Sequence, residues 1–213
     1  RASATDPTYA YWVEQQMPAI PVVPQKVSSL LAGLEQPQVP QGLILEFGVW
    51  SGRTISVIAQ HRPSSAVYGF DSFEGLPEAW RPGFGKEAFD TNGNMPAVPA
   101  NVHLVKGWFD ATLPGFLAAH PGPAAFIHVD CDVYSSARTV LETLAPRIVP
   151  GTVIVFDELV NYPQYREHEL KAFYEFVRDH GRAFSWVSAM CPVALEAAEG
   201  AYECQGVAVR ITS

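Results

Sequence analysis

The strongest indication of the fold is the segment LILEFGVWSG at residues 43–52. It begins with an apolar run and continues into a turn that carries Gly48 and Gly52. A buried strand followed by a glycine turn and a helix is typical of nucleotide-binding α/β sheets, because glycine allows a tight turn and a close approach to a cofactor. Since short glycine patterns also occur in plain turns, the interpretation depends on the rest of the chain.

The same alternation continues along the chain, where apolar runs expected as strands alternate with stretches of helical spacing. The expected strands are 43–47, 66–70, 102–106, 125–129, 152–156, 184–188 and 207–211. The expected helices are 27–34, one after Gly52, one opened by Thr112 and Pro114, one from Ser135 with Asp132 as a cap, and 170–177. Buried-type strands that alternate with helices predict a parallel sheet with helices on both faces.

No repeat and no composition-biased linker divides the chain, so we expect one domain over residues 1–213. Residues 1–40 are expected as an arm, irregular up to residue 24, followed by the first helix, packed on the core. Residues 72–101 are too long for a plain connector and are expected as a lid or substrate loop. Since the chain begins with Arg1 instead of Met, we expect a processed chain or a domain of a longer protein.

Composition argues against several classes of partner. The chain has 14 Lys and Arg against 22 Asp and Glu, with a net charge of −8 and no basic cluster, which argues against nucleic acid. No apolar run approaches the ~20 residues that span a bilayer, so we expect no membrane association. The three cysteines have neither metal-binding nor redox spacing, which predicts reduced thiols and a cytoplasmic location.

Acidic residues gather at the expected carboxyl edge of the sheet, where α/β sheets bind ligands. Glu46 lies inside the end of the first strand, and Asp71, Asp130 and Asp157 each follow or end a strand. Asp71 lies about where a strand-two acid meets ribose hydroxyls in nucleotide-binding sheets. Grouped carboxylates repel each other unless a cationic ligand joins them.

Three of these acids form a second candidate site. Asp130, Asp157 and Glu158 follow neighbouring strands and offer the hard oxygen ligands that Mg²⁺ prefers. Helix capping by each aspartate is the alternative. Among the histidines, His128 is expected to hydrogen-bond within the core, whereas His168 lies near the ligand edge.

Four motifs together resemble a known family. The run EFGVWSG at 46–52 resembles the first motif of class I S-adenosylmethionine-dependent methyltransferases. The segments YGFDSFEGLP at 68–77, KGWFDATLP at 106–114 and HVDCDVYSS at 128–136 are similar to the metal-dependent macrocin/mycinamicin O-methyltransferases. This resemblance covers about residues 43–157. It implies a Rossmann-like, mostly parallel seven-stranded sheet of order 3-2-1-4-5-7-6, with the last strand antiparallel.

The resemblance also implies roles for single residues. For the cofactor S-adenosylmethionine, the methionine part would lie at Glu46 and the glycine turn, the ribose at Asp71, and the adenine between Ser72 and the Gly107–Trp108 backbone. Asp130, Asp157 and Glu158 would hold Mg²⁺, although the family usually has two aspartates in the last pair. The family's base is a histidine between strands two and three, and residues 72–101 contain none, so His168 becomes the candidate base beside Asp130.

The predicted function is a Mg²⁺-assisted O-methyltransferase that acts on a hydroxyl of a small molecule, of sugar, polyketide or other natural-product type. The alternative is a scaffold or sensor domain that binds the cofactor without turnover. A nicotinamide-dependent oxidoreductase fits poorly, because Val49 and Trp50 stand where its glycine fingerprint needs a glycine. A homo-oligomer, or fusion to a larger biosynthetic protein, is left open.

Overall fold

The computed structural model describes residues 6–23, 28–195 and 204–213. Within them, seven strands form one sheet in the order β3-β2-β1-β4-β5-β7-β6, with β7 antiparallel to both of its neighbours. The predicted topology is therefore confirmed. The strands are β1 Leu43–Phe47, β2 Val67–Asp71, β3 Val102–Lys106, β4 Ala124–Val129, β5 Val153–Phe156, β6 Phe184–Ala189 and β7 Val207–Ile211.

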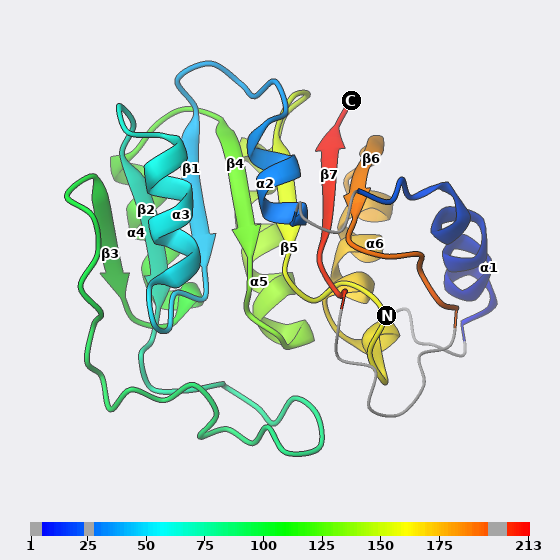
Figure 1. The fold of residues 1–213 in the computed structure, drawn as a ribbon, viewed down its shortest axis with the longest axis horizontal. Coiled ribbons are helices and arrows are strands. Elements are labelled where there is room, and N and C mark those ends of the chain that lie inside the picture. Colours follow the sequence, from blue (N-terminus) through cyan, green and yellow to red (C-terminus); the bar gives the residue numbers. More distant parts are fainter. Residues whose placement is uncertain (1–5, 24–27, 196–203) are drawn as a thin grey trace.

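Helices cover both faces of the sheet (Figure 1). One face carries α2 (Ser29–Leu34) and α3 (Arg53–His61), and the other carries α4 (Phe109–Ala119), α5 (Tyr134–Leu144) and α6 (Glu169–Asp179). Short 3₁₀ turns lie at Met17–Ala19, Ala145–Arg147 and Tyr165–Glu167. The sheet is thus the middle of three layers, and its carboxyl edge is left for the connecting loops.

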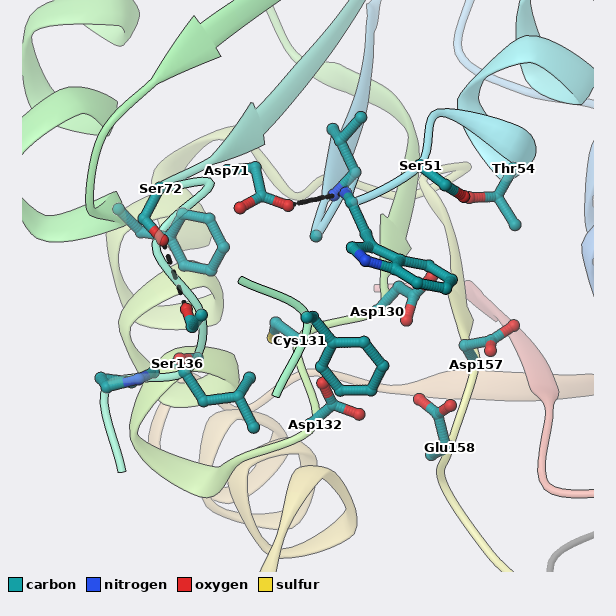
Figure 2. A pocket seen from close by; sticks show the side chains of 18 of the residues that line it. Ser51, Thr54, Asp71, Ser72, Asp130, Cys131, Asp132, Ser136, Asp157 and Glu158 are labelled. Atoms are coloured by element: carbon teal, nitrogen blue, oxygen red, sulfur yellow. Dashed lines mark hydrogen bonds between the residues drawn. The ribbon is translucent and has the colours of Figure 1, made fainter. Parts of the chain in front are cut away.

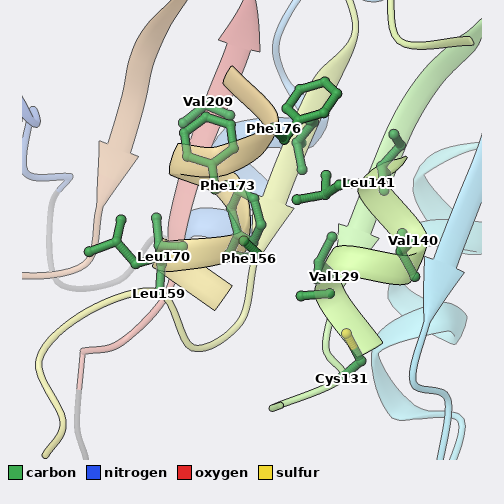
Figure 3. Close-up of a cluster of buried hydrophobic side chains, with 14 of the residues drawn as sticks. Val129, Cys131, Val140, Leu141, Phe156, Leu159, Leu170, Phe173, Phe176 and Val209 are labelled. Carbon is green, nitrogen blue, oxygen red and sulfur yellow. The ribbon is translucent and has the colours of Figure 1, made fainter. Parts of the chain in front are cut away.

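The larger part of the hydrophobic core lies between the sheet and helices α4 to α6. Phe173 and Phe176 of α6 pack with Leu141 of α5 and with Phe156 of β5 (Figure 3). The ring centroids of Phe156 and Phe173 are 5.2 Å apart in an edge-to-face arrangement. The continuous apolar sequence of β4 and β5 follows from this arrangement, because both faces of these strands are buried.

The N-terminal segment differs from its prediction. Instead of an irregular arm, residues Pro7–Gln16 form helix α1, whose N-cap Asp6 accepts a hydrogen bond from the Thr8 N–H at 2.8 Å. Tyr9 of this helix is fully buried, with its ring 4.8 Å from that of Tyr174 on α6. Proline at the first helical position is compatible with a helix start. The predicted irregular structure was wrong here, and residues 1–5 and Val27 lie outside the described residues.

Three further local predictions were wrong. Helix α4 begins at Phe109, before the predicted start at Thr112 and Pro114, because Trp108 already has extended cap geometry and accepts from the Thr112 hydroxyl at 2.9 Å. Asp132 does not cap α5, since its φ of 64° turns the chain and Val133 takes the cap position. Cys191 and Cys204 form a disulfide, against the prediction of reduced thiols. Sequence spacing does not reveal which thiols meet in space.

Residues 72–101 run across the carboxyl edge of the sheet, as the long green connection of Figure 1 shows. Trp80 anchors this segment, which is called the lid loop after its predicted role. The residue is only 5% exposed, and its ring lies 5.8 Å from that of Tyr162. The Ser135 hydroxyl donates to Glu78 at 2.7 Å, which fixes the same stretch to the start of α5. Within the described residues, no helix has the length and apolar character needed to cross a bilayer.

Candidate active site

A pocket opens at the carboxyl edge of the sheet, beneath the lid loop (Figure 2). The turn after β1, the end of β2, the start of α4 and the residues after β4 and β5 form its walls. The predicted site residues that line it are Gly48, Asp71, Ser72, Trp108, Asp130, Asp157 and Glu158. The predicted site residues outside its lining are Glu46, Gly52, Gly107 and His168.

The turn after β1 requires glycine at its first position. Gly48 has a φ of 93°, and a Cβ added there would lie 1.7 Å from the carbonyl oxygen of Asp130. Only glycine therefore lets the ends of β1 and β4 approach this closely. Gly52, with a φ of 78°, is the N-cap of α3 and lies just behind the pocket wall.

Asp71 has a role that the sequence did not reveal. Its Oδ2 accepts hydrogen bonds from the backbone N–H groups of Val49 and Trp50, each at 2.8 Å, and its Oδ1 accepts from Phe73 N–H at 2.7 Å. The carboxylate thereby joins the glycine turn to the first residues of the lid loop. The Oδ2 atom uses both of its lone pairs in these bonds, whereas Oδ1 accepts one bond and keeps one lone pair for a further donor. The contact of Asp71 with a ribose stays a prediction.

Exposed aromatic side chains border the mouth of the pocket. Trp50 is 50% exposed and Trp108 is 39% exposed, and Phe89 of the lid loop meets Trp50 edge-to-face at 5.6 Å. Flat apolar surfaces of this kind suit the faces of aromatic or sugar rings. Trp108 was predicted, whereas Trp50 was noted only as a residue excluding a nicotinamide fingerprint.

Four acids lie on the wall opposite Asp71 (Figure 2). They are Asp130, Asp132, Asp157 and Glu158. Burial raises the pKa of Asp130 and of Glu158 well above the ordinary range, and the mutual repulsion of the acids adds to the effect. Burial also raises the pKa of Asp132 to about 7. The Glu158 Oε2 atom is buried and has no hydrogen-bond partner among the described residues. Such a set of under-compensated oxygens fits a cation.

The structure groups the predicted ligands differently from the sequence. One ligand atom from each of His128, Asp130 and Asp157 lies within 4.8 Å of the others. Glu158 lines the same pocket but is not part of that group. Sequence reasoning missed His128 as a possible ligand, although the signal was present: two positions before Asp130 on a strand is the same face of the sheet.

Glu46 lies behind the pocket instead of lining it. Its Oε1 accepts from the Thr54 hydroxyl at 2.7 Å, and its Oε2 lies 3.5 Å from Nδ1 of His128. Burial raises the pKa of Glu46. Burial lowers the pKa of His128, but the carboxylates of Asp157 and Glu46 outweigh this effect and raise it overall.

His168 contacts Tyr162 and does not line the pocket. Its Nδ1 lies 3.2 Å from the Tyr162 hydroxyl, and its ring stacks on that of Tyr162 with Trp80 nearby at 6.5 Å. Burial lowers its pKa to about 4, so the imidazole is neutral at neutral pH. A neutral imidazole suits a base, but this one does not line the pocket, and its role as the base stays a prediction.

Known proteins match both the sequence and the fold. The family model described as a methyltransferase domain matches residues 45–159, more than half of the chain. The chain belongs to this methyltransferase family. A calicheamicin methyltransferase, CalS11, has a similar structure, with a TM-score of 0.64 at 21% identity over 99% of this chain and 94% of that one. Family and fold together place this domain among the class I S-adenosylmethionine-dependent methyltransferases.

Two curated relatives add information on chemistry. The domain is 34% identical over 143 residues to the 8-demethyl-8-(2,3-dimethoxy-alpha-L-rhamnosyl)-tetracenomycin-C 4'-O-methyltransferase of Streptomyces olivaceus, covering 55% of this chain and 52% of the relative. It is 25% identical over 149 residues to the demethyldecarbamoylnovobiocin O-methyltransferase of Streptomyces niveus, covering 59% of this chain and 56% of the relative. The chain thus spans about half the length of the curated relatives it matches.

Proposed function

We propose that this methyltransferase domain transfers the methyl group of S-adenosylmethionine to a hydroxyl of a small molecule, of the sugar or polyketide natural-product type, with the help of a divalent cation. The observation that carries the proposal is the position of Asp71 and of the pair Asp130 and Asp157 on opposite walls of one pocket. The two curated relatives, both O-methyltransferases of natural products, support the substrate class.

The cofactor side of the pocket comes from β1 and β2. Gly48 leaves room beside the backbone of Asp130, and Asp71 holds the turn in place while its Oδ1 keeps one lone pair free. Ser72 and Trp108 flank the same wall, as proposed for the adenine. When bound there, the sulfonium cofactor supplies the methyl group and carries the difficult chemistry.

The acidic side would hold the cation through Asp130, Asp157 and Glu158. These residues fit a hard divalent ion, because they are buried or partly buried carboxylates and the Glu158 Oε2 has no other partner. A bound divalent cation lowers the pKa of an oxygen that it coordinates. Two neighbouring acceptor oxygens, as in a vicinal diol, suit such a site.

The remaining task of the protein is alignment and exclusion of water. Leu76, Pro77 and Phe89 of the lid loop line the pocket between the two walls and present apolar surface to an acceptor. In the transfer, the acceptor oxygen bonds to the methyl carbon, the carbon–sulfur bond breaks to leave the thioether, and the hydroxyl proton passes to a base. His168 stays the sequence prediction for that base, and residues 72–101 are proposed as a lid within one domain.

Turnover with S-adenosylmethionine tests the proposal, on a panel of glycosylated natural products with vicinal hydroxyls and with Mg²⁺ present. We expect one methyl group per acceptor and S-adenosylhomocysteine as the second product. The alternative is a domain that binds the cofactor as a scaffold or sensor. Calorimetric binding of S-adenosylhomocysteine, together with no turnover on the whole panel, would favour that alternative.

A further inference from the structure

We infer that His128 is a nitrogen ligand of the cation in this site, beside Asp130 and Asp157, and that the site therefore prefers a first-row transition-metal ion to Mg²⁺. The inference rests on the proposed function for the presence of a cation. It goes further by naming an additional ligand and the class of ion.

The position of His128 in the sheet brings it to the acids. His128 and Asp130 lie two residues apart at the end of β4, and alternate residues of a strand share a face. The Nε2 atom of His128 is 3.8 Å from Oδ1 of Asp157, which follows the neighbouring strand β5. Ligand atoms bound about 2.1 Å from one ion lie roughly 3–4.2 Å apart, so this separation fits a shared ion.

The two ring nitrogens of His128 face the carboxylates of Glu46 and Asp157 at 3.5 and 3.8 Å, farther than a normal hydrogen bond. His128 is fully buried, and neither of its ring nitrogens makes a hydrogen bond within the described structure. A buried polar group without a partner is costly, and such groups are rare in folded proteins. An ion between His128 and the acids would give Nε2 the partner that it lacks.

The second ring nitrogen faces a carboxylate that is itself held in place. Nδ1 lies 3.5 Å from the Glu46 Oε2, and the Thr54 hydroxyl fixes the other oxygen of Glu46 at 2.7 Å. Histidines that bind metals almost always give their other N–H to a carboxylate, carbonyl or water, which orients the ring. This arrangement also explains why Glu46 is buried behind the pocket instead of lining it.

The donor set determines the class of ion. Oxygen-only sites suit Mg²⁺, whereas imidazole suits Fe, Ni, Cu and Zn, and affinity at mixed sites rises from Mn²⁺ toward Co²⁺ and Ni²⁺. A site of one imidazole and the carboxylates of Asp130, Asp157 and Glu158 is therefore expected to bind Mn²⁺ and Co²⁺ in preference to Mg²⁺.

Pulsed electron paramagnetic resonance on the metal-free protein loaded with less than one equivalent of Mn²⁺ tests this directly. The buffer should be mildly alkaline, because imidazole must lose its proton to coordinate. We expect nitrogen modulation from a directly bound imidazole in the unmodified protein. His128→Gln should lose the modulation and bind Mn²⁺ at least ~10-fold more weakly, whereas His103→Gln, at an exposed histidine of β3, should keep both.

Competition and cofactor binding complete the experiment. A more than ~10-fold excess of Mg²⁺ should be needed to displace half of the Mn²⁺ from the unmodified protein. If Mn²⁺ binds without nitrogen modulation, the ligands are all oxygens and the inference is wrong, while the cation of the proposed function stands. If neither ion binds while S-adenosylhomocysteine does, the cation itself is wrong. Because the unmodified protein decides both points, a poorly folded variant leaves the result intact.

Discussion

The two faces of strand β4 have opposite chemistry. On one face, Ile127, Val129 and Cys131 belong to the apolar cluster packed against α5 and α6 (Figure 3). On the other face, Phe126 is followed by His128, which is fully buried, and by Asp130, which lines the pocket. A single extended segment thus contributes to the core with one set of residues and to the site with the alternate set.

The difference between these faces separates stability from function. Burial and close packing of the apolar face stabilise the folded protein. The polar face destabilises the folded metal-free protein, because burial raises the pKa of Asp130 and so disfavours its charged form. Changes on the first face should alter unfolding, and changes on the second should alter ligand binding and turnover.

Removal of the cation should have the largest effect and should involve the polar face alone. We expect exhaustive EDTA treatment to abolish turnover, and added Mg²⁺ or Mn²⁺ to restore it, because a bound cation relieves the repulsion among Asp130, Asp157 and Glu158. Initial rates measure the effect, and retained S-adenosylhomocysteine binding is the control. Full activity after chelation would show that these acids are caps or substrate contacts.

In the apolar cluster that covers the first face of β4, Phe173→Ala on α6 should reduce the free energy of unfolding by about 3–5 kcal/mol. The ring is fully buried between Phe156 and Phe184, so its removal leaves a cavity. Urea denaturation gives the value. At a temperature where the variant is folded, its affinity for S-adenosylhomocysteine should be unchanged, and a loss of affinity larger than the loss of stability would contradict the separation of the two faces.

Asp71→Ala sharpens the comparison at the cofactor edge. We expect binding of S-adenosylhomocysteine to weaken by about 1.5–3 kcal/mol, because charge-assisted hydrogen bonds are lost and the glycine turn is no longer held. Calorimetry measures it. Asp90→Ala is a matched control, since Asp90 accepts from the Asn92 N–H in the lid loop without lining the pocket. Equal affinities for unmodified protein and Asp71→Ala would exclude the ribose contact.

The acids should also make stability depend on pH in the absence of metal. Asp132 has a pKa raised from 3.8 to about 7 in the folded state, so between these values the folded protein holds a proton that the unfolded chain has lost. The free energy of unfolding should therefore fall as the pH rises through this window, by up to about 4 kcal/mol for this residue. Denaturation in EDTA should show a flatter profile for Asp132→Asn, and an unchanged slope would contradict the assignment.

The smallest effect is expected at His168. A positioned base contributes ~10²–10⁴-fold to kcat, but the contacts of His168 with Tyr162 place it outside the pocket lining. If His168 only packs on Tyr162, His168→Gln should change kcat by less than ~threefold, with the metal still required. A drop in kcat of ~100-fold or more, with the melting temperature unchanged, would instead establish His168 as the base.

The sequence predicted the central sheet well because buried parallel strands are continuous apolar runs. It also placed Asp71, Asp130 and Asp157 at strand ends, where the structure has them. Helix α1 was missed because tertiary packing of Tyr9 on Tyr174 stabilises it, and a local pattern does not report such a contact. The disulfide was missed because the spacing of Cys191 and Cys204 in the sequence does not show that they meet in space.

The site was less predictable than the fold. The backbone bonds to Asp71 depend on the positive φ values of Trp50 (45°) and Phe73 (60°), which turn N–H groups toward the carboxylate. Neither value follows from residue type, because both are bulky side chains that rarely adopt this region. The cluster around His128 likewise depends on register between β1, β4 and β5, which pairs Glu46 with His128.

The anchoring of Trp80 determines how often the middle of the lid loop leaves the body of the domain. Exposing an indole that buries about 150–250 Å² costs about 4–6 kcal/mol at ~25 cal/mol per Å². Since each ~1.4 kcal/mol changes the ratio of two populations tenfold, only about one molecule in a thousand or fewer has this side chain withdrawn at any instant. The stretch around Trp80 is therefore held against the body of the domain in nearly every molecule, while the exposed side chains of Trp50 and Trp108 border the mouth of the pocket.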